Sequence, residues 1–117
     1  MAEWHFYAAG SSKTNDKKRW TTGTAEEKQL IKKSIKVAVD WQKKTGIYTW
    51  VGAWMPGAYN KDDNYSVKGQ TEFASFMTQQ LDKHGVPFAI NADHHFYDYK
   101  AEQWIPKYKD LLNTIFM

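Results

Sequence analysis

The chain has 117 residues, among them six tryptophans, seven tyrosines and six phenylalanines, with no cysteine and a formal net charge of +3. This length allows one modest domain, and a chain so short buries only about two thirds of the surface that it exposes when unfolded. The lack of cysteine excludes a disulfide framework and cysteine zinc sites. An apolar content of 42% argues against disorder, because it can offset the entropy of ordering the chain.

The positive charge is carried almost entirely by lysine, since Arg19 is the one arginine in the sequence. Lysine lacks the planar fork with which arginine binds phosphate or guanine, so we expect no nucleic-acid partner. Six lysines share one expected helix with Glu26, Glu27 and Asp40, and a solvated helix face explains them. They are Lys28, Lys32, Lys33, Lys36, Lys43 and Lys44.

No segment predicts a membrane helix or a secretory signal. The main uncharged stretch, residues 47–60, is shorter than the roughly 20 apolar residues that a membrane span requires. Met1 is followed by Ala2-Glu3-Trp4, without the basic, apolar and small-residue succession of a signal peptide. We therefore expect no membrane partner, and the residues alone leave the cellular location open.

Three short runs of aromatic and β-branched residues predict strands at residues 3–9, 47–54 and 87–92. None of the runs alternates cleanly between polar and apolar residues. Nearly continuous apolar runs are typical of strands that are covered on both faces, as in parallel sheets.

Helical patterns follow these strands. Thr24 and Glu27 have the spacing of a capping box, and the pattern after them predicts a helix that ends at Gly46. Ser66 is expected to cap a second helix, and Pro106 suits the first turn of a third. The expected apolar stripes are Leu30, Ile31, Ile35, Ala38 and Trp41 or Gln42 in the first helix, Phe73, Phe76, Met77 and Leu81 in the second, and Tyr108, Leu111, Leu112 and Ile115 in the third.

The order of strand, loop and helix occurs three times, which predicts an α/β fold of three consecutive βα units with parallel strands. The long connections run from strand to helix, and in such folds these loops build the functional face. Three parallel strands leave both sheet edges open, and a closed barrel of eight such units needs about 250 residues. We therefore expect residues 1–117 to be one part of a (β/α)₈ TIM barrel, with self-association as one way to cover the open edges.

Candidate functional residues lie on or after each expected strand. His5 and Tyr7 are two residues apart, so they point to the same side and can together hold hydroxyls or an anion, although the spacing alone favours a packed pair whose polar tips find local partners. In the second strand, the same rule places Trp50, Gly52 and Trp54 on one side and Val51 and Ala53 on the other. The third strand ends in the densest polar cluster of the chain, Asn91-Ala92-Asp93-His94-His95.

Aromatic residues near strand ends suit a carbohydrate groove, because sugars combine apolar C–H faces with many hydroxyls, and Trp and Tyr have apolar bodies with polar tips. Each of these residues also has an interpretation as core. The aromatic candidates in or beside the strand-to-helix loops are Trp20, Trp54, Tyr59 and Tyr65. Trp41 and Trp104, by contrast, are expected in the core.

These residues resemble the carboxyl-terminal portion, strands six to eight, of a glycoside hydrolase of family five, the cellulase-like (β/α)₈ barrels. His5-Phe6-Tyr7 resembles the His-x-Tyr motif of strand six, and Val51-Gly52-Ala53-Trp54 resembles the Gly-Glu-aromatic segment of strand seven. The runs Thr-Gly-Thr-Ala-Glu-Glu-Lys-Gln-Leu at residues 22–30 and Gly-Ala-Trp-Met-Pro-Gly at residues 52–57 are also similar to bacterial cellulase-like sequences.

The resemblance implies a polysaccharide-hydrolysing enzyme that acts on β-glucan or a related polysaccharide, needs no cofactor or metal, and is secreted or periplasmic in its full-length form. It implies substrate-binding roles on all three strands. The implied substrate-binding residues are His5, Tyr7, Trp20, Trp54, Asn91 and Asp93.

Ala53 departs from the family pattern at a decisive position. Retaining glycosidases use two carboxylates about 5 Å apart, a nucleophile and an acid/base. The resemblance places the acid/base on strand four, upstream of Met1, and the nucleophile at Ala53, where a methyl group cannot attack a sugar. We therefore expect this chain alone to be inactive. Asp62, Asp63 and Asp93 are candidate replacements, and the position of Asp93 favours it.

Two functions of other classes remain open. A non-catalytic carbohydrate-binding protein fits the missing carboxylates, and release of reducing ends would distinguish an enzyme from it. A metal site is the second, because His5 and Asp93 could converge with one of His94 and His95, which point oppositely on an extended strand. Zinc or manganese that is lost in His5→Ala would support that alternative.

Overall fold

The computed structural model describes residues 1–8, 19–56, 65–91 and 96–116. In chain order, the elements are β1 (Ala2–Tyr7), α1 (Ala25–Thr45), β2 (Thr49–Met55), α2 (Val67–Lys83), β3 (Phe88–Ile90), β4 (Tyr97–Asp98), β5 (Gln103–Trp104), the 3₁₀ turn η1 (Pro106–Tyr108) and α4 (Lys109–Phe116). The strands β1, β2 and β3 form a parallel sheet in that order, so the predicted α/β fold with parallel strands is confirmed.

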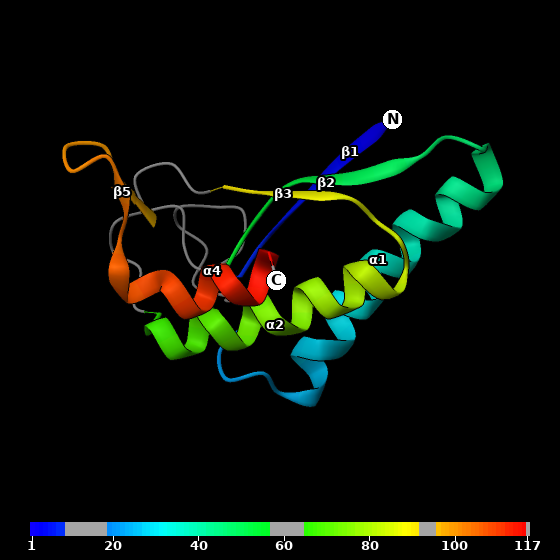
Figure 1. Cartoon of the computed structure of the whole chain (residues 1–117). Coiled ribbons are helices and arrows are strands. Elements are labelled where there is room, and N and C mark those ends of the chain that lie inside the picture. Colours follow the sequence, from blue (N-terminus) through cyan, green and yellow to red (C-terminus); the bar gives the residue numbers. More distant parts are fainter. Residues whose placement is uncertain (9–18, 57–64, 92–95, 117) are drawn as a thin grey trace, which may run out of the picture.

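The three helices lie on one face of this sheet, and no described helix covers the other face (Figure 1). Helix α2 packs between α1 and α4. Among the described residues, β1 and β3 form the two edges of the sheet. None of the described helices is long and apolar enough to cross a membrane.

The hydrophobic core fills the space between the sheet and the helices. Phe73 of α2 lies at its centre, with ring centroids 6.1 Å from Phe6, 5.3 Å from Trp20 and 5.8 Å from Trp54. Burial of each such side chain contributes about 1.5–3 kcal/mol. Further fully buried core residues from the strands and helices are Ile31, Ile35, Val51, Met77, Leu81 and Leu111.

Helix α1 begins and ends where its sequence predicts. The backbone N–H of Glu27 donates to the hydroxyl of Thr24 at 3.2 Å, and the Glu27 carboxylate accepts the N–H of Thr24 at 3.0 Å, which completes the capping box. Gly46 ends the helix with φ of 73°, a left-handed conformation that glycine adopts without strain. Ser66 caps α2 in the predicted way by accepting the N–H of Gly69.

The structure corrects several expected boundaries. Strand β1 ends at Tyr7 rather than at residue 9, and β3 covers only Phe88–Ile90 of the expected 87–92. The short antiparallel hairpin of β4 and β5 was not predicted, because two-residue strands carry no readable hydrophobic period.

Strand β2 contains a bulge at Ala53, which reverses the side on which Trp54 lies. In the pairing with β3, β2 has one residue more between Gly52 and Trp54, and in the pairing with β1, Gly52 and Ala53 together oppose His5. An extra residue shifts the alternation by one position. Trp54 therefore joins Val51 on the helix side, and the expectation that it shares a side with Gly52 is wrong.

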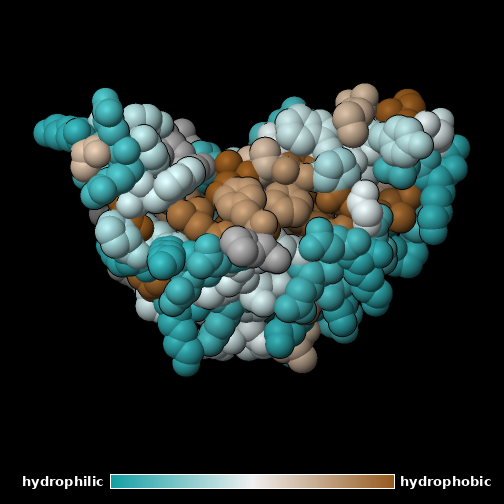
Figure 2. Space-filling view, viewed as in Figure 1, coloured by the Kyte–Doolittle hydropathy of each residue, from teal (hydrophilic) through white to brown (hydrophobic). Residues whose placement is uncertain are grey.

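An apolar groove adjoins the open β1 edge, and a second apolar groove lies beside α4. One groove, of about 510 Å³, lies between β1 and α1, and the other, of about 440 Å³, lies between β5 and α4. Figure 2 shows apolar side chains gathered over β3 and α4, along the second edge. The apolar residues of the first groove include Trp4, Leu30, Val37 and Trp41, and those of the second include Trp104, Ile105, Leu112 and Phe116. These grooves lie where further βα units of a barrel would pack.

Candidate functional site

The uncovered face of the sheet carries the polar side chains of β1. Glu3, His5 and Tyr7 alternate with Trp4 and Phe6, which pack on the helix side. His5 and Tyr7 therefore lie on the same side of the strand, as their spacing predicts. Their rings meet edge to face, with centroids 6.3 Å apart. An imidazole and a phenol in this arrangement can donate hydrogen bonds to, or accept them from, the hydroxyls of one ligand.

Glu3 is a member of this row that the sequence interpretation missed. Its Oε1 lies 2.8 Å from Nε2 of His5, and both side chains are about half exposed, at 46% and 51%. A hydrogen bond so exposed adds little stability, but it orients the imidazole ring. The period-two spacing that links His5 to Tyr7 also reaches Glu3, so the same rule could have found it.

Ala53, the expected nucleophile position, lies at the bulge of β2 and is half-buried beside β1. Bulges often occur next to active sites, where they redirect a side chain. Glu3 is the one carboxylate on β1, β2 and β3, and it is hydrogen-bonded to His5. The described sheet thus presents one carboxylate rather than the pair that glycoside hydrolysis requires.

The third strand brings Asn91 to the same end of the sheet. Its backbone N–H donates to the carbonyl of Trp54 at 2.9 Å, which extends the pairing of β3 with β2 by one step. Asn91 is half-buried at the carboxyl end of the strand, the end at which α/β folds place ligand sites. The structure thus brings His5, Tyr7 and Asn91 onto one small sheet.

Several predicted residues lie outside the described part of the chain. Asp93, the candidate substitute carboxylate and substrate-binding residue, is one of them, together with Asp62, Asp63 and Tyr59. His94 and His95 of the alternative metal site also lie there. Among the described residues, no group of three His, Cys, Asp or Glu side chains could hold a metal ion.

Trp20 and Trp54 are core residues, so the expectation that they bind substrate is wrong. Trp20 is 2% exposed and packs against Phe73 and Phe76 of α2. Trp54 is fully buried between Phe73 and Phe88. A sugar ring cannot stack on a face that other rings already cover.

The opposite correction applies to Trp41 and Trp104, which were expected in the core. Trp41 is 39% exposed and lines the groove between β1 and α1, whereas Trp104 is 52% exposed and lines the groove beside α4. Tyr65, a loop candidate, is half-buried, and its hydroxyl donates to the carbonyl oxygens of Ala8 and Trp20. The Tyr65 hydroxyl, just before α2, is therefore hydrogen-bonded to the residues that follow β1 and precede α1.

No protein-family model matches the sequence, and no curated protein matches it. Solved structures do match. An endoglucanase superposes on 97% of this chain with a TM-score of 0.68 and 17% identity. The cellulose synthase subunit Z of Clostridioides difficile superposes on 98% with a TM-score of 0.72 and 15% identity. Cel5A of Thermotoga maritima, in complex with cellobiose, superposes on 97% with a TM-score of 0.70 and 18% identity.

The chain spans 38–40% of the length of these three structures. At such low identity the likeness concerns the fold, and it agrees with a three-stranded parallel sheet that is open at both edges. The expected likeness to cellulase-type barrels is confirmed at that level. The chain has the fold of one part of the (β/α)₈ barrel found in these structures.

Proposed function

We propose that this chain is the carboxyl-terminal part, strands six to eight, of a family-five glycoside hydrolase barrel, and that the carboxyl ends of its strands, on the uncovered side of the sheet, bind β-glucan or a related polysaccharide. The observation that carries the proposal is the row of His5 and Tyr7 on a sheet of endoglucanase fold, with Asn91 two strands away. Two of the similar solved structures contain cellobiose and mannotriose, which are short β-linked sugars.

The chemistry of the face suits sugar hydroxyls. The Glu3 carboxylate accepts hydrogen bonds, the Tyr7 hydroxyl and the His5 imidazole both donate and accept, and the Asn91 amide does the same. Such groups bind a sugar best when they are already oriented, because less entropy is then lost on binding. The 2.8 Å bond between Glu3 and His5 provides that orientation for the imidazole.

Hydrolysis by the chain alone is not part of the proposal. Ala53 stands at the nucleophile position, and the family resemblance puts the acid/base on a strand outside this chain. Asp93 remains the proposed substitute carboxylate. In a longer protein that contains the other strands, Asp93→Asn should then abolish the release of reducing ends, while Ala53→Glu should create or increase it.

A second candidate function is a binding protein without turnover, which Ala53 favours. One measurement on that longer protein, the release of reducing ends, distinguishes the two candidate functions. A protein that binds β-glucan but releases no reducing ends, even after prolonged incubation, is a binding protein. Measurable release identifies the hydrolase.

Titration of the isotope-labelled chain with cellotetraose, followed by NMR, tests binding directly. The expected result is a saturable shift of the amide signals of His5, Tyr7 and Asn91. His5→Ala should weaken binding, whereas His84→Ala, at the carboxyl end of α2, should leave it unchanged. Shifts confined to the helices, or none up to millimolar ligand, would refute a glycan site on this face.

A further inference from the structure

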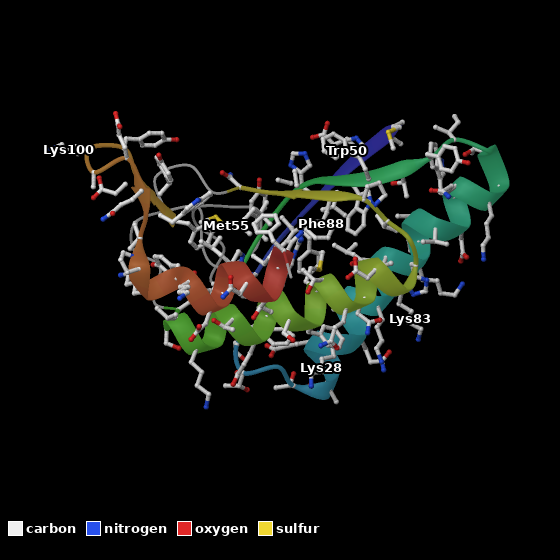
Figure 3. The ribbon with its side chains drawn as sticks, viewed as in Figure 1. Lys28, Trp50, Met55, Lys83, Phe88 and Lys100 are labelled. Atoms are coloured by element: carbon white, nitrogen blue, oxygen red, sulfur yellow. The ribbon has the colours of Figure 1, made fainter. Side chains whose placement is uncertain are left out.

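The outer side of the helix layer carries a groove that the proposed function does not use. It runs between α1 and α2 as two consecutive hollows of about 420 and 350 Å³. Lys28 and Gln79 line the first hollow, and Lys32 and Gln80 line the second, so the hollows lie end to end along the two helices. Figure 3 shows Lys28 and Lys83 on the side of the helices away from the sheet. The groove therefore lies opposite the proposed glycan site.

This groove concentrates the positive charge of the chain. Its lining includes five lysines and two carboxylates, a net charge of +3 that equals the formal net charge of all 117 residues. Both carboxylates are already engaged, because Asp40 binds Lys36, and Oε1 of Glu72 lies 3.7 Å from Nζ of Lys68, which lines neither hollow. Among the described residues, the other four lysines of the groove form no ion pair. They are Lys28, Lys32, Lys43 and Lys83.

The spacing of the lysines brings like charges together. Lys28, Lys32 and Lys36 follow each other at intervals of four residues, and like charges at that spacing destabilise a helix. A solvated face accounts for the exposure of the six lysines of α1, but not for the alignment of four of them along one groove. An anionic ligand in the groove would relieve their repulsion.

We propose that the groove between α1 and α2 binds a linear acidic polysaccharide, a chain of uronate sugars whose carboxylates pair with the lysines. The amides of Gln79 and Gln80 lie at the junction of the two hollows and can bind sugar hydroxyls. From Lys28 to Lys43 the rise of α1 covers about 22 Å, which accommodates several sugar residues. This surface is separate from the sheet face, so the inference does not depend on the proposed function.

Other polyanions fit the groove less well. No arginine lines it, and lysine lacks the planar fork with which arginine binds duplex nucleic acid. Single strands need exposed rings on which bases stack, but Phe76 lies between Trp20 and the Lys28 ammonium, which is 5.6 Å from the centre of its ring. An anionic membrane is broad and flat, and binding to it requires exposed apolar side chains, whereas Val39 of the groove is half-buried.

Calorimetric titration with a polygalacturonate oligomer tests the proposal. Binding should be saturable and should weaken as salt is added, because ions screen exposed charges. The methyl-esterified oligomer has the same chain without the carboxylate charges, and it should not bind. Equal binding of both oligomers, or no binding of the charged one at low salt, would overturn the inference. Tighter binding of DNA or of vesicles of anionic lipid would overturn the choice of a polysaccharide.

Two triple variants locate the charge that binds. The groove variant replaces three lysines of the groove by glutamine, namely Lys32→Gln, Lys43→Gln and Lys83→Gln. The control variant removes the same charge outside the groove, with Lys33→Gln, Lys100→Gln and Lys107→Gln. All six side chains are exposed, so both variants should fold. The groove variant should bind polygalacturonate about tenfold more weakly because three ion pairs are lost, and the control should change by less than about twofold. Equal affinities of the two variants would overturn the assignment of the groove.

NMR of the wild type separates this inference from the proposed function. Polygalacturonate should shift the amide signals of Lys32, Lys43 and Lys83 and leave those of His5 and Tyr7 in place. Shifts at His5 and Tyr7 instead would assign the acidic chain to the sheet face and overturn this inference, while the proposed function would stand. The groove variant should bind cellotetraose as the wild type does, since its substitutions lie on the other side of the molecule.

Discussion

The two faces of the sheet differ in what their side chains contact. On the helix side, Phe6, Val51 and Trp54 are buried against α2 and its neighbours. On the other side, Glu3 and His5 stay about half exposed, and their described polar contact is with each other. One face therefore holds the fold together, and the other is free for a ligand. Substitutions on the helix side should therefore lower stability, whereas substitutions on the other side should change ligand binding.

The largest effect is expected at the centre of the helix side. Phe73→Ala removes a buried ring that three other aromatic residues contact, and should lower the free energy of unfolding by about 3–5 kcal/mol. Phe116→Ala deletes the same side chain at a position that is 63% exposed and serves as the control. Urea denaturation followed by circular dichroism gives both values. Similar losses for the two variants would contradict the assignment of the core.

The next effect concerns the start of α1. Thr24→Ala removes the hydroxyl that accepts the N–H of Glu27, and should lower the free energy of unfolding by about 1 kcal/mol. Ser34→Ala removes a hydroxyl from the middle of the same helix, where it only donates to the carbonyl of Leu30. That loss should be close to zero. Equal effects would mean that the cap does not define this end of the helix.

The same cap predicts a dependence of stability on pH. Burial raises the pKa of the Glu27 carboxyl, but hydrogen bonds from Thr24, Thr21 and Gly23 outweigh it, so the pKa lies below its ordinary value of 4.5. A lowered pKa in the folded state contributes stability above the unfolded pKa, and this is lost as pH falls through the folded pKa.

Glu27→Gln tests this dependence. The difference in unfolding free energy between wild type and variant should be constant near neutral pH and shrink below about pH 5. Glu26→Gln, the neighbouring acid of the first turn, is the control. Urea denaturation between pH 3 and pH 7, a range spanning roughly both sides of the ordinary carboxyl pKa, supplies the comparison. A difference that grows on acidification would contradict the assigned role of the carboxylate.

Local patterns predicted the elements of this chain well. The capping box of Thr24 and Glu27, the cap at Ser66 and the glycine at Gly46 are short-range signals, and the hydrogen bonds that they predict all form. The parallel order of the strands followed from the repeated succession of strand and helix. The alternation along β1 likewise placed His5 with Tyr7.

The burial of the tryptophan side chains could not be predicted from the same patterns. Trp20 and Trp54 were assigned to a groove and are buried, whereas Trp41 and Trp104 were assigned to the core and are partly exposed. A bulge such as that at Ala53 leaves no mark in a single sequence, yet it turns Trp54 to the other face. A helix stripe shows that a face is apolar, but not whether any part of the chain covers it.

The smallest effect on stability, and the sharpest test of the open edges, is expected at Val37. This residue is 62% exposed in the groove between β1 and α1, so Val37→Lys should change the free energy of unfolding by less than about 0.5 kcal/mol.

If copies of the chain cover this groove by pairing, sedimentation should show association of the wild type at high concentration. The added charge should weaken that association, because burying an unpaired ammonium is costly. Gln29→Lys places the same charge on α1 outside the groove, and association should persist there. Equal association in all three proteins would mean that the β1 edge is not the contact, and would leave the β3 edge with its apolar band as the surface through which copies meet.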